Sequence, residues 1–169
     1  MNSLDKAFLE ESKFRLESSF IRLFHCLDQL EEEQIWWKPD EKMNSIGILI
    51  KHICGNLRQW TVIQMNGSED RRNRDEEFKD KEKLSKMELI NLLEKINKDF
   101  KSSAENFDPA QLGKPKSVQG YKVTIMTAMY RSMTHLEGHV GQIILLTRLQ
   151  LGNSYKIYSQ AKAGELKVP

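Results

Sequence analysis

Apolar residues recur at steps of three and four in the first part of the chain, a spacing typical of amphipathic helices. In residues 3–30 the apolar face consists of Leu4, Phe8, Leu16, Phe20, Leu23, Leu27 and Leu30. A second helix is predicted over residues 44–66, with an apolar face made of Ile46, Leu49, Ile50, Ile53, Leu57 and Trp60. Its opposite face carries Gly47, Lys51 and Arg58, which we expect to be solvated.

The second half of the chain contains two more patterns of this kind. Ser85 and Glu88 form a capping-box pair at the start of a third helix, which ends at Asp108 and Pro109. Its apolar face consists of Leu89, Leu93, Ile96, Phe100 and Phe107. A fourth helix is predicted over residues 124–151, with the face Ile125, Met129, Met133, Leu136, Val140, Ile143 and Ile144. Four long amphipathic helices without a strand repeat predict an all-α fold, a four-helix bundle.

The segments between these helices differ in kind. Residues 31–43 contain Trp36, Trp37 and Pro39 and are expected to pack over one end of the bundle. Residues 67–83 are long and highly charged, which suits a crossover that runs the length of the bundle. Residues 112–123 combine Gly, Pro and β-branched residues, a composition that allows a short hairpin.

Composition limits the classes of protein that need to be considered. A chain of 169 residues with 39% hydrophobic residues predicts one domain, residues 1–169. The 26 Lys and Arg are interspersed with 24 Asp and Glu, which argues against a nucleic-acid partner. The apolar runs are too short to span a bilayer, and the N-terminal residues lack the pattern of a signal peptide. Cys26 and Cys54 stand apart, without a CxxC motif. We therefore expect a cytoplasmic protein without membrane contact.

Histidine placement is the most informative chemical feature. His135 and His139 are four residues apart, so both project from one side of the predicted fourth helix. This spacing can place two nitrogens on one metal ion, each about 2.0–2.1 Å away if the ion is zinc. His52 has a similar position on the second helix, and three imidazoles would leave a coordination position open. From spacing alone, a chance pair and a buried core histidine are the more common explanation.

The sequence around these histidines resembles the DinB/YfiT-like superfamily of bacterial metal-binding four-helix bundles. The resemblance rests on two motifs, residues 44–53 with His52 and the stretch His135-Leu136-Glu137-Gly138-His139-Val140-Gly141-Gln142-Ile143. Residues 72–78 and Gly55-Asn56 are similar to one branch of small bacterial proteins in that superfamily. The resemblance covers nearly the whole chain. It implies that His52, His135 and His139 are metal ligands, with zinc or nickel as the first candidates and manganese as another.

The resemblance also implies alternatives for function. Relatives with this triad are thiol-dependent S-transferases that use low-molecular-weight thiols such as bacillithiol or mycothiol, with a small electrophile as the second substrate. Other relatives suggest a metal-dependent hydrolase, and a third alternative is a non-enzymatic, stress-related protein with a structural metal site. Hydrolysis ordinarily needs a general base beside the metal. Glu137 lies between the two histidines but faces away at i+2 from His135, which favours thiol transfer.

Several polar residues near the motifs have two interpretations. Asn56 and Gln142 lie one turn from a histidine and either orient a ligand at the metal or form an ordinary buried polar pair. The run that contains Arg72, Arg74, Asp75 and Glu77 is most simply solvated. Its alternative is a salt-bridged cover or an anion contact near the site, formed by Arg74 or Asp75.

The other candidates for a role are placed elsewhere. His25 is opposite the main apolar face of the first helix and is expected to make a surface or subunit contact. Cys54 is two residues from His52 and points to a different side, so it is predicted to be a small buried residue. Phe14 and Ile21 form a second apolar strip on the first helix, and together with the resemblance they suggest a homodimer.

Overall fold

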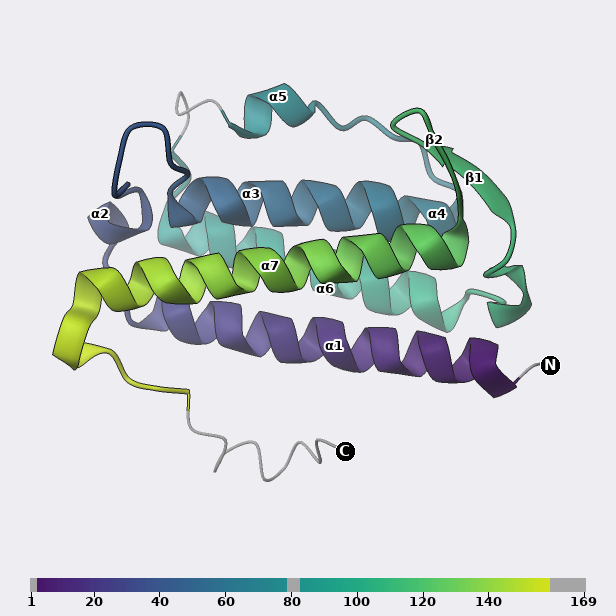
Figure 1. Ribbon diagram of the computed structural model, residues 1–169, viewed down its shortest axis with the longest axis horizontal. Helices are drawn as coiled ribbons and strands as arrows, with labels where there is room; N and C mark the ends of the chain where they lie inside the picture. The colour runs from purple at the N-terminus through teal and green to yellow at the C-terminus, as the bar shows by residue number, and fades with distance from the viewer. Residues whose placement is uncertain (1–2, 79–82, 159–169) are drawn as a thin grey trace.

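The computed structural model describes residues 3–78 and 83–158, so residues 79–82 of the predicted crossover and 159–169 of the tail lie outside the described residues. Four long helical segments lie side by side (Figure 1). They are α1 (Ser3–Asp28), α6 (Lys86–Glu105), α7 (Ile125–Leu151), and a continuous segment made of α3 (Ile46–Leu57), the π-helix η1 (Arg58–Val62) and α4 (Ile63–Asn66). The four-helix bundle predicted from the sequence is confirmed.

The order of the helices in space requires a long crossover. α1 packs against α6 and α7, and α3 packs against the same two helices, so α1 and α3 are opposite each other across the core. Figure 1 shows that α3 and α6 run in the same direction. Two consecutive parallel helices need a connection that returns along the bundle. The segment containing the short helix α5 (Arg74–Glu77) provides this return and lies over α3. The predicted crossover is therefore confirmed.

The predicted apolar faces form the core between the four helices. Among the described residues, nearly all members of these faces are buried. Phe8 and Ile144 are only partly buried, and Leu4 is 71% exposed. Leu4 is exposed because the first turn of α1 extends past the start of α7 (Figure 1). Crossing a bilayer needs a helix of about 20 largely apolar residues, and no helix in the described part of the chain meets that requirement.

The connection between α1 and α3 packs over one end of the bundle, as predicted. It contains the short helix α2 (Glu32–Ile35), and both Ile35 and Trp36 are buried. Trp36 Nε1 donates a hydrogen bond of 3.0 Å to the carbonyl oxygen of Leu84. The indole ring covers Gly47 so closely that a Cβ there would lie 2.7 Å from the ring. Gly47 is thus buried, and its predicted place on a solvated face is wrong.

The Gly47→Ala variant is expected to lower the free energy of unfolding by about 1–2 kcal/mol. Overpacking against Trp36 costs about 1–3 kcal/mol, and the higher helix propensity of alanine offsets part of it. Urea denaturation measures the change. The control is Gly138→Ala in α7, where the added Cβ meets nothing within 4 Å and stability should rise by about 0.5–1 kcal/mol. Equal gains in both variants would show that Trp36 does not constrain Gly47.

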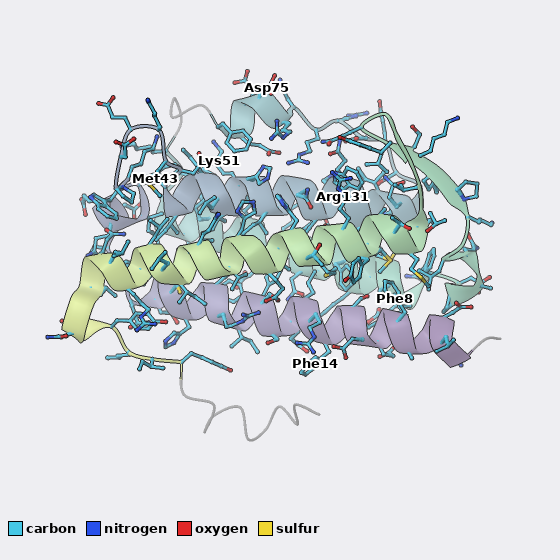
Figure 2. All side chains as sticks on the ribbon, viewed as in Figure 1. Phe8, Phe14, Met43, Lys51, Asp75 and Arg131 are labelled. Carbon is cyan, nitrogen blue, oxygen red and sulfur yellow. The ribbon has the colours of Figure 1, made fainter. Side chains whose placement is uncertain are left out.

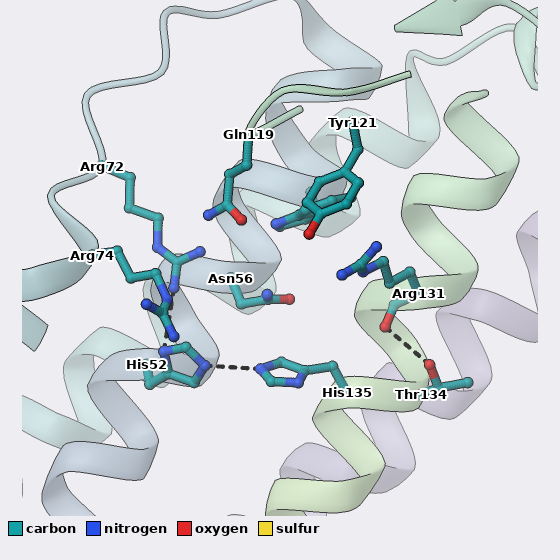
Figure 3. Close-up of a pocket in the computed structure, with 10 residues that line it drawn as sticks. His52, Asn56, Arg72, Arg74, Gln119, Tyr121, Arg131, Thr134 and His135 are labelled. Atoms are coloured by element: carbon teal, nitrogen blue, oxygen red, sulfur yellow. Dashed lines mark hydrogen bonds between the residues drawn. The ribbon is translucent and has the colours of Figure 1, made fainter. Parts of the chain in front are cut away.

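A β-hairpin closes the other end of the bundle. β1 (Pro115–Val118) pairs antiparallel with β2 (Tyr121–Thr124), and Val118 is opposite Tyr121. Gln119 (φ 51°) and Gly120 (φ 79°) form the two-residue turn, and positive φ at both central residues is the type I′ pattern of tight hairpins. The hairpin prediction for residues 112–123 is confirmed. The hairpin also positions Gln119 beside η1, and Tyr121 beside η1 and α7 (Figure 3).

Candidate metal centre

The structure brings the three predicted histidines together from two antiparallel helices. His52 Nε2 on α3 lies 2.8 Å from His135 Nε2 on α7, and His139 Nε2 lies 3.1 Å from the same atom. The three candidate ligand atoms, one from each imidazole, all lie within 4.8 Å of one another and could hold one metal ion. His52 is buried, whereas His135 and His139 are half-buried.

The local sequence explains why these side chains converge. Leu136 and Val140 directly follow His135 and His139, and both are fully buried in the core. This burial fixes the rotation of α7, so the two histidines lie beside the core and face α3. Ile53 fixes α3 in the same way next to His52.

Hydrogen bonds at the second ring nitrogens determine which atoms face the centre of the cluster. His52 Nδ1 lies 2.9 Å from Glu77 Oε2, an acceptor, and His139 Nδ1 lies 2.8 Å from Gln142 Oε1, also an acceptor. Both Nδ1 atoms therefore donate, and each Nε2 presents a lone pair to His135 Nε2. A proton on His135 Nε2 can form a hydrogen bond with only one of these two lone pairs. A divalent cation in place of that proton can bind the lone pairs of all three Nε2 atoms, so the three imidazoles fit a metal ion.

The surroundings of the cluster lower the pKa of both His135 and His139. Burial, together with the nearby charges of His139, His52, Arg72 and Arg131, lowers the pKa of His135 to about 4. Burial also lowers the pKa of His139, although the hydrogen bond to Gln142 opposes this effect. Neutral imidazole is the form that coordinates metal ions.

A buried ion pair from the crossover supports His52. Arg72 Nε donates to Glu77 Oε1 and Arg72 Nη2 to Glu77 Oε2, each at 2.7 Å. Only 5% of the Arg72 side chain and 11% of the Glu77 side chain are exposed. Burial alone would raise the pKa of Glu77, but hydrogen bonds from Arg72 and His52 hold it below its usual range. A Cβ on Gly55 would overlap Glu77, so the glycine gives the ion pair room against α3.

The structure assigns different roles to the charged run than the sequence did. A salt-bridged cover exists, but Arg72 and Glu77 form it instead of Arg74 or Asp75. Asp75 is exposed and projects away from the bundle (Figure 2). Arg74 lies over the ring of Phe78 at 5.1 Å, and that ring packs against His52 with its centroid 4.9 Å away. The prediction that this run is solvated is therefore wrong for Arg72 and Glu77.

An open cleft of about 580 Å³ reaches the histidines (Figure 3). His52 and His135 belong to its lining, as do three arginines and a polar and aromatic wall. These other residues include Arg72, Arg74, Arg131, Gln119, Trp60 and Tyr121. None of the described lining residues is an Asp or a Glu.

Gln59 is a functional neighbour that the sequence interpretation missed. Its Oε1 accepts hydrogen bonds from Arg72 Nη1 at 2.9 Å and from Gln119 Nε2 at 2.7 Å. Its Nε2 donates to Asp70 at 2.6 Å. Gln59 thus joins the crossover and the hairpin to η1, and π-helical turns of this kind are frequent at functional sites. No distinctive signal in the sequence marks this role, because the same helical segment also contains the polar residues Asn56, Arg58 and Thr61.

Asn56 and Gln142, for which the sequence allowed two interpretations, make different contacts. Gln142 orients His139 through the hydrogen bond described above. Asn56 lines the cleft, and its Oδ1 accepts a hydrogen bond of 2.8 Å from Ser132 Oγ, which joins α3 to α7.

The remaining candidates lie outside the cluster. His25 Nε2 is 2.6 Å from the carbonyl oxygen of Lys156, and its ring packs against Tyr155 and Tyr158, so it contacts the tail. Cys54 is buried, and burial raises the pKa of its thiol. Glu137 is hydrogen-bonded to Ser19 and pairs with Arg22 at 2.7 Å, both on α1. It faces away from the histidines, as predicted.

The Glu77→Gln variant is expected to weaken zinc binding about 10- to 100-fold, the usual effect of removing a carboxylate that orients a metal-ligating histidine. Competition with a chromophoric chelator measures the affinity. Asp75→Asn removes the same charge from an exposed position in the same segment, and its affinity should match the wild type. If both variants lose affinity equally, the effect comes from the overall charge of the segment instead of from the contact with His52.

The fold is that of a DinB-like helical bundle. A solved DinB-like protein from Bacillus cereus ATCC 10987 matches with a TM-score of 0.67 at 18% identity, covering 86% of this chain and 91% of that chain. A DinB-like protein from Bacillus subtilis matches with a TM-score of 0.60 at 18% identity, covering 94% and 98%. These likenesses confirm the fold expected from the resemblance.

The family follows from the sequence itself. The chain belongs to the family described as "Protein of unknown function (DUF1572)", whose model matches residues 3–164. No curated protein matches the chain.

Proposed function

We propose that the protein binds a divalent metal ion, zinc or nickel before manganese, through His52, His135 and His139, and that it is a metal-dependent thiol S-transferase. The observation that supports this proposal best is the position of the cluster, because His52 and His135 lie in the wall of an open cleft. The cluster contains three candidate ligands among the described residues, so no fourth protein ligand closes it there. Catalytic metal sites keep such a position open, whereas structural sites fill it.

The chemistry of thiol transfer fits these surroundings. A divalent ion with an open position lowers the pKa of a thiol and so supplies a sulfur nucleophile at neutral pH. In the transfer the thiol gives its proton to solvent, the sulfur lone pair forms a C–S bond with an electrophilic carbon, and the leaving group departs with its bonding electrons. The cleft volume of about 580 Å³ is in the range of small-molecule sites. It can admit a low-molecular-weight thiol such as bacillithiol together with a small electrophile.

Hydrolysis has less support from the described residues. A hydrolase would ordinarily need a general base within reach of the reacting water. No described Asp or Glu lines the cleft, and both carboxylate oxygens of Glu77 are engaged by Arg72 and His52. Glu137 is held by α1. These contacts favour thiol transfer over hydrolysis.

A fluorogenic electrophile tests the transferase proposal. Zinc-, nickel- or manganese-loaded protein is incubated with monochlorobimane and one thiol at a time, including bacillithiol, and bimane fluorescence is followed. We expect at least one thiol to react faster than with the same protein after chelation. If metal is demonstrably bound and no thiol reacts faster, the transferase proposal is wrong and a structural metal site remains.

We also propose that the chain forms a homodimer through the strip on α1 that contains Phe14 and Ile21. Both side chains are only half-buried in the single chain. Sedimentation should give a species of twice 19.7 kDa, and a species of 19.7 kDa alone would contradict the dimer.

A further inference from the structure

We propose that the cleft beside the histidines binds an oxyanion, a carboxylate or a phosphate, through Arg131 and Arg74, and that the thiol substrate carries this group. The second part of the inference rests on the proposed function. The first part concerns only residues of the cleft and can be tested without a metal.

The cleft carries positive charge that no described carboxylate in its lining compensates. Three arginines line it, and Glu77 pairs with one of them, Arg72. In the described part of the chain, Arg131 and Arg74 have aromatic partners and no carboxylate partner. The whole chain carries a formal charge of only +2. Two unpaired guanidinium groups facing one cleft therefore mark a local preference for an anion.

Two aromatic rings hold Arg131 in place. Its guanidinium carbon lies 4.8 Å from the ring centroid of Trp60 and 4.7 Å from that of Tyr121. Trp60 is buried and is held by η1, so the arginine packs against a fixed surface. Stacking uses the face of the guanidinium and leaves its N–H edge free to donate. Figure 3 shows this edge turned into the cleft, opposite Arg72 and Arg74.

Arg131 and His135 lie on neighbouring turns of α7, along the same side of the cleft. Arg131 lies four residues before His135 on α7, so the two side chains project from the same face, with Cβ atoms about 5–6 Å apart. Arg74 approaches from the crossover on the other side of the cleft, next to His52 (Figure 3). If the sulfur of a ligand lies at the histidines, a group only a few bonds from that sulfur can reach the arginines. The geometry indicates a small thiol with its anionic group close to the sulfur.

Anion binding to the metal-free protein tests the cleft itself. Calorimetric titration with succinate and with inorganic phosphate should detect binding of at least one of them to the wild type, and the preferred anion identifies the group. Arg131→Gln should weaken this binding about tenfold or more, because it removes charged hydrogen bonds. The matched control is Arg148→Gln, also an arginine of α7 stacked on a tyrosine, which lies outside the cleft and should bind normally. No binding of either anion, or equal binding to wild type and Arg131→Gln, would overturn the inference.

A second titration connects the anion site to the thiol. Cobalt-loaded protein is titrated with mercaptosuccinate and with neutral thioglycerol, and the sulfur-to-cobalt absorption band reports binding. We expect mercaptosuccinate to bind at least tenfold more tightly, and Arg131→Gln to remove this preference without changing the affinity for thioglycerol. Equal affinity for both thiols in the wild type would refute the anionic substrate and leave the proposed function intact. If cobalt is bound and neither thiol gives the absorption band, thiols do not bind at the metal and the proposed thiol transfer is wrong. The calorimetric titration with succinate and phosphate then still tests the anion site.

Discussion

Replacement of His135 by alanine is expected to lower the zinc affinity of the protein by about 10²- to 10³-fold. His135 Nε2 is the central atom of the cluster, since it lies 2.8 Å from His52 Nε2 and 3.1 Å from His139 Nε2. Zinc binding to four-ligand structural sites amounts to about 10–16 kcal/mol, or about 2.5–4 kcal/mol for each ligand. Without His135, the remaining pair must bind the ion from two different helices. Chelator competition gives the affinity, and metal analysis of tag-free protein gives the content.

The control for this experiment is the histidine that the structure places elsewhere. His25 contacts the tail through Lys156 and two tyrosines, so His25→Ala should retain the wild-type metal content. The His135→Ala chain should remain folded, because the side chain is only half-buried; circular dichroism checks this. Equal metal content in His135→Ala and wild type would refute the proposed ligand set.

Removal of the metal is expected to lower the melting temperature by about 8–16 °C. A ligand present at about 1,000 times its Kd stabilises the folded state by about 4 kcal/mol. In a chain of this size each kcal/mol shifts Tm by about 2–4 °C. The physical reason is that the ion joins α3 to α7 and satisfies lone pairs that otherwise face one another. Calorimetry of the zinc-loaded and chelator-treated protein, at fixed protein concentration, measures the shift.

The His135→Ala variant is also the reference for this second experiment. Zinc at the same concentration should raise its melting temperature by only about 1–6 °C, because a 10²- to 10³-fold loss of affinity leaves the ion at about 1–10 times the Kd of the variant and gives about 0.4–1.4 kcal/mol of stabilisation. A shift of wild-type size in the variant would show that zinc stabilises the fold through another site. The absence of a shift in the wild type would argue against a bound ion that bridges the two helices.

The helices and their buried faces were predictable because the spacing of apolar residues reports the side of a helix that faces the core. The error at Gly47 shows the limit of this rule. Periodicity places Gly47 on the polar side of α3, but Trp36 from the preceding connection covers that side. Contacts between a helix and a distant loop leave no periodic signal in either segment.

The histidine cluster was predictable because its spacing and neighbouring residues form a motif. The contacts around it were not, since they depend on the path of the crossover and on the hairpin. Glu77 reaches His52 only because Gly55 leaves room on α3. Arg131 is held by Trp60 and Tyr121, which come from η1 and β2. The sequence of a charged run or a short hairpin does not indicate which of its side chains will face a helix of the bundle.

X-ray absorption at the zinc edge of zinc-loaded protein tests the central proposal most directly, because it counts the atoms bound to the ion. We expect three imidazole nitrogens at about 2.0–2.1 Å from the zinc and no sulfur from the protein. Cys54 lies two residues from His52, is buried and has a raised thiol pKa, so it is not expected to contribute. A sulfur at about 2.3 Å in the absence of added thiol, or a shell with fewer than two imidazoles, would contradict the three-histidine site.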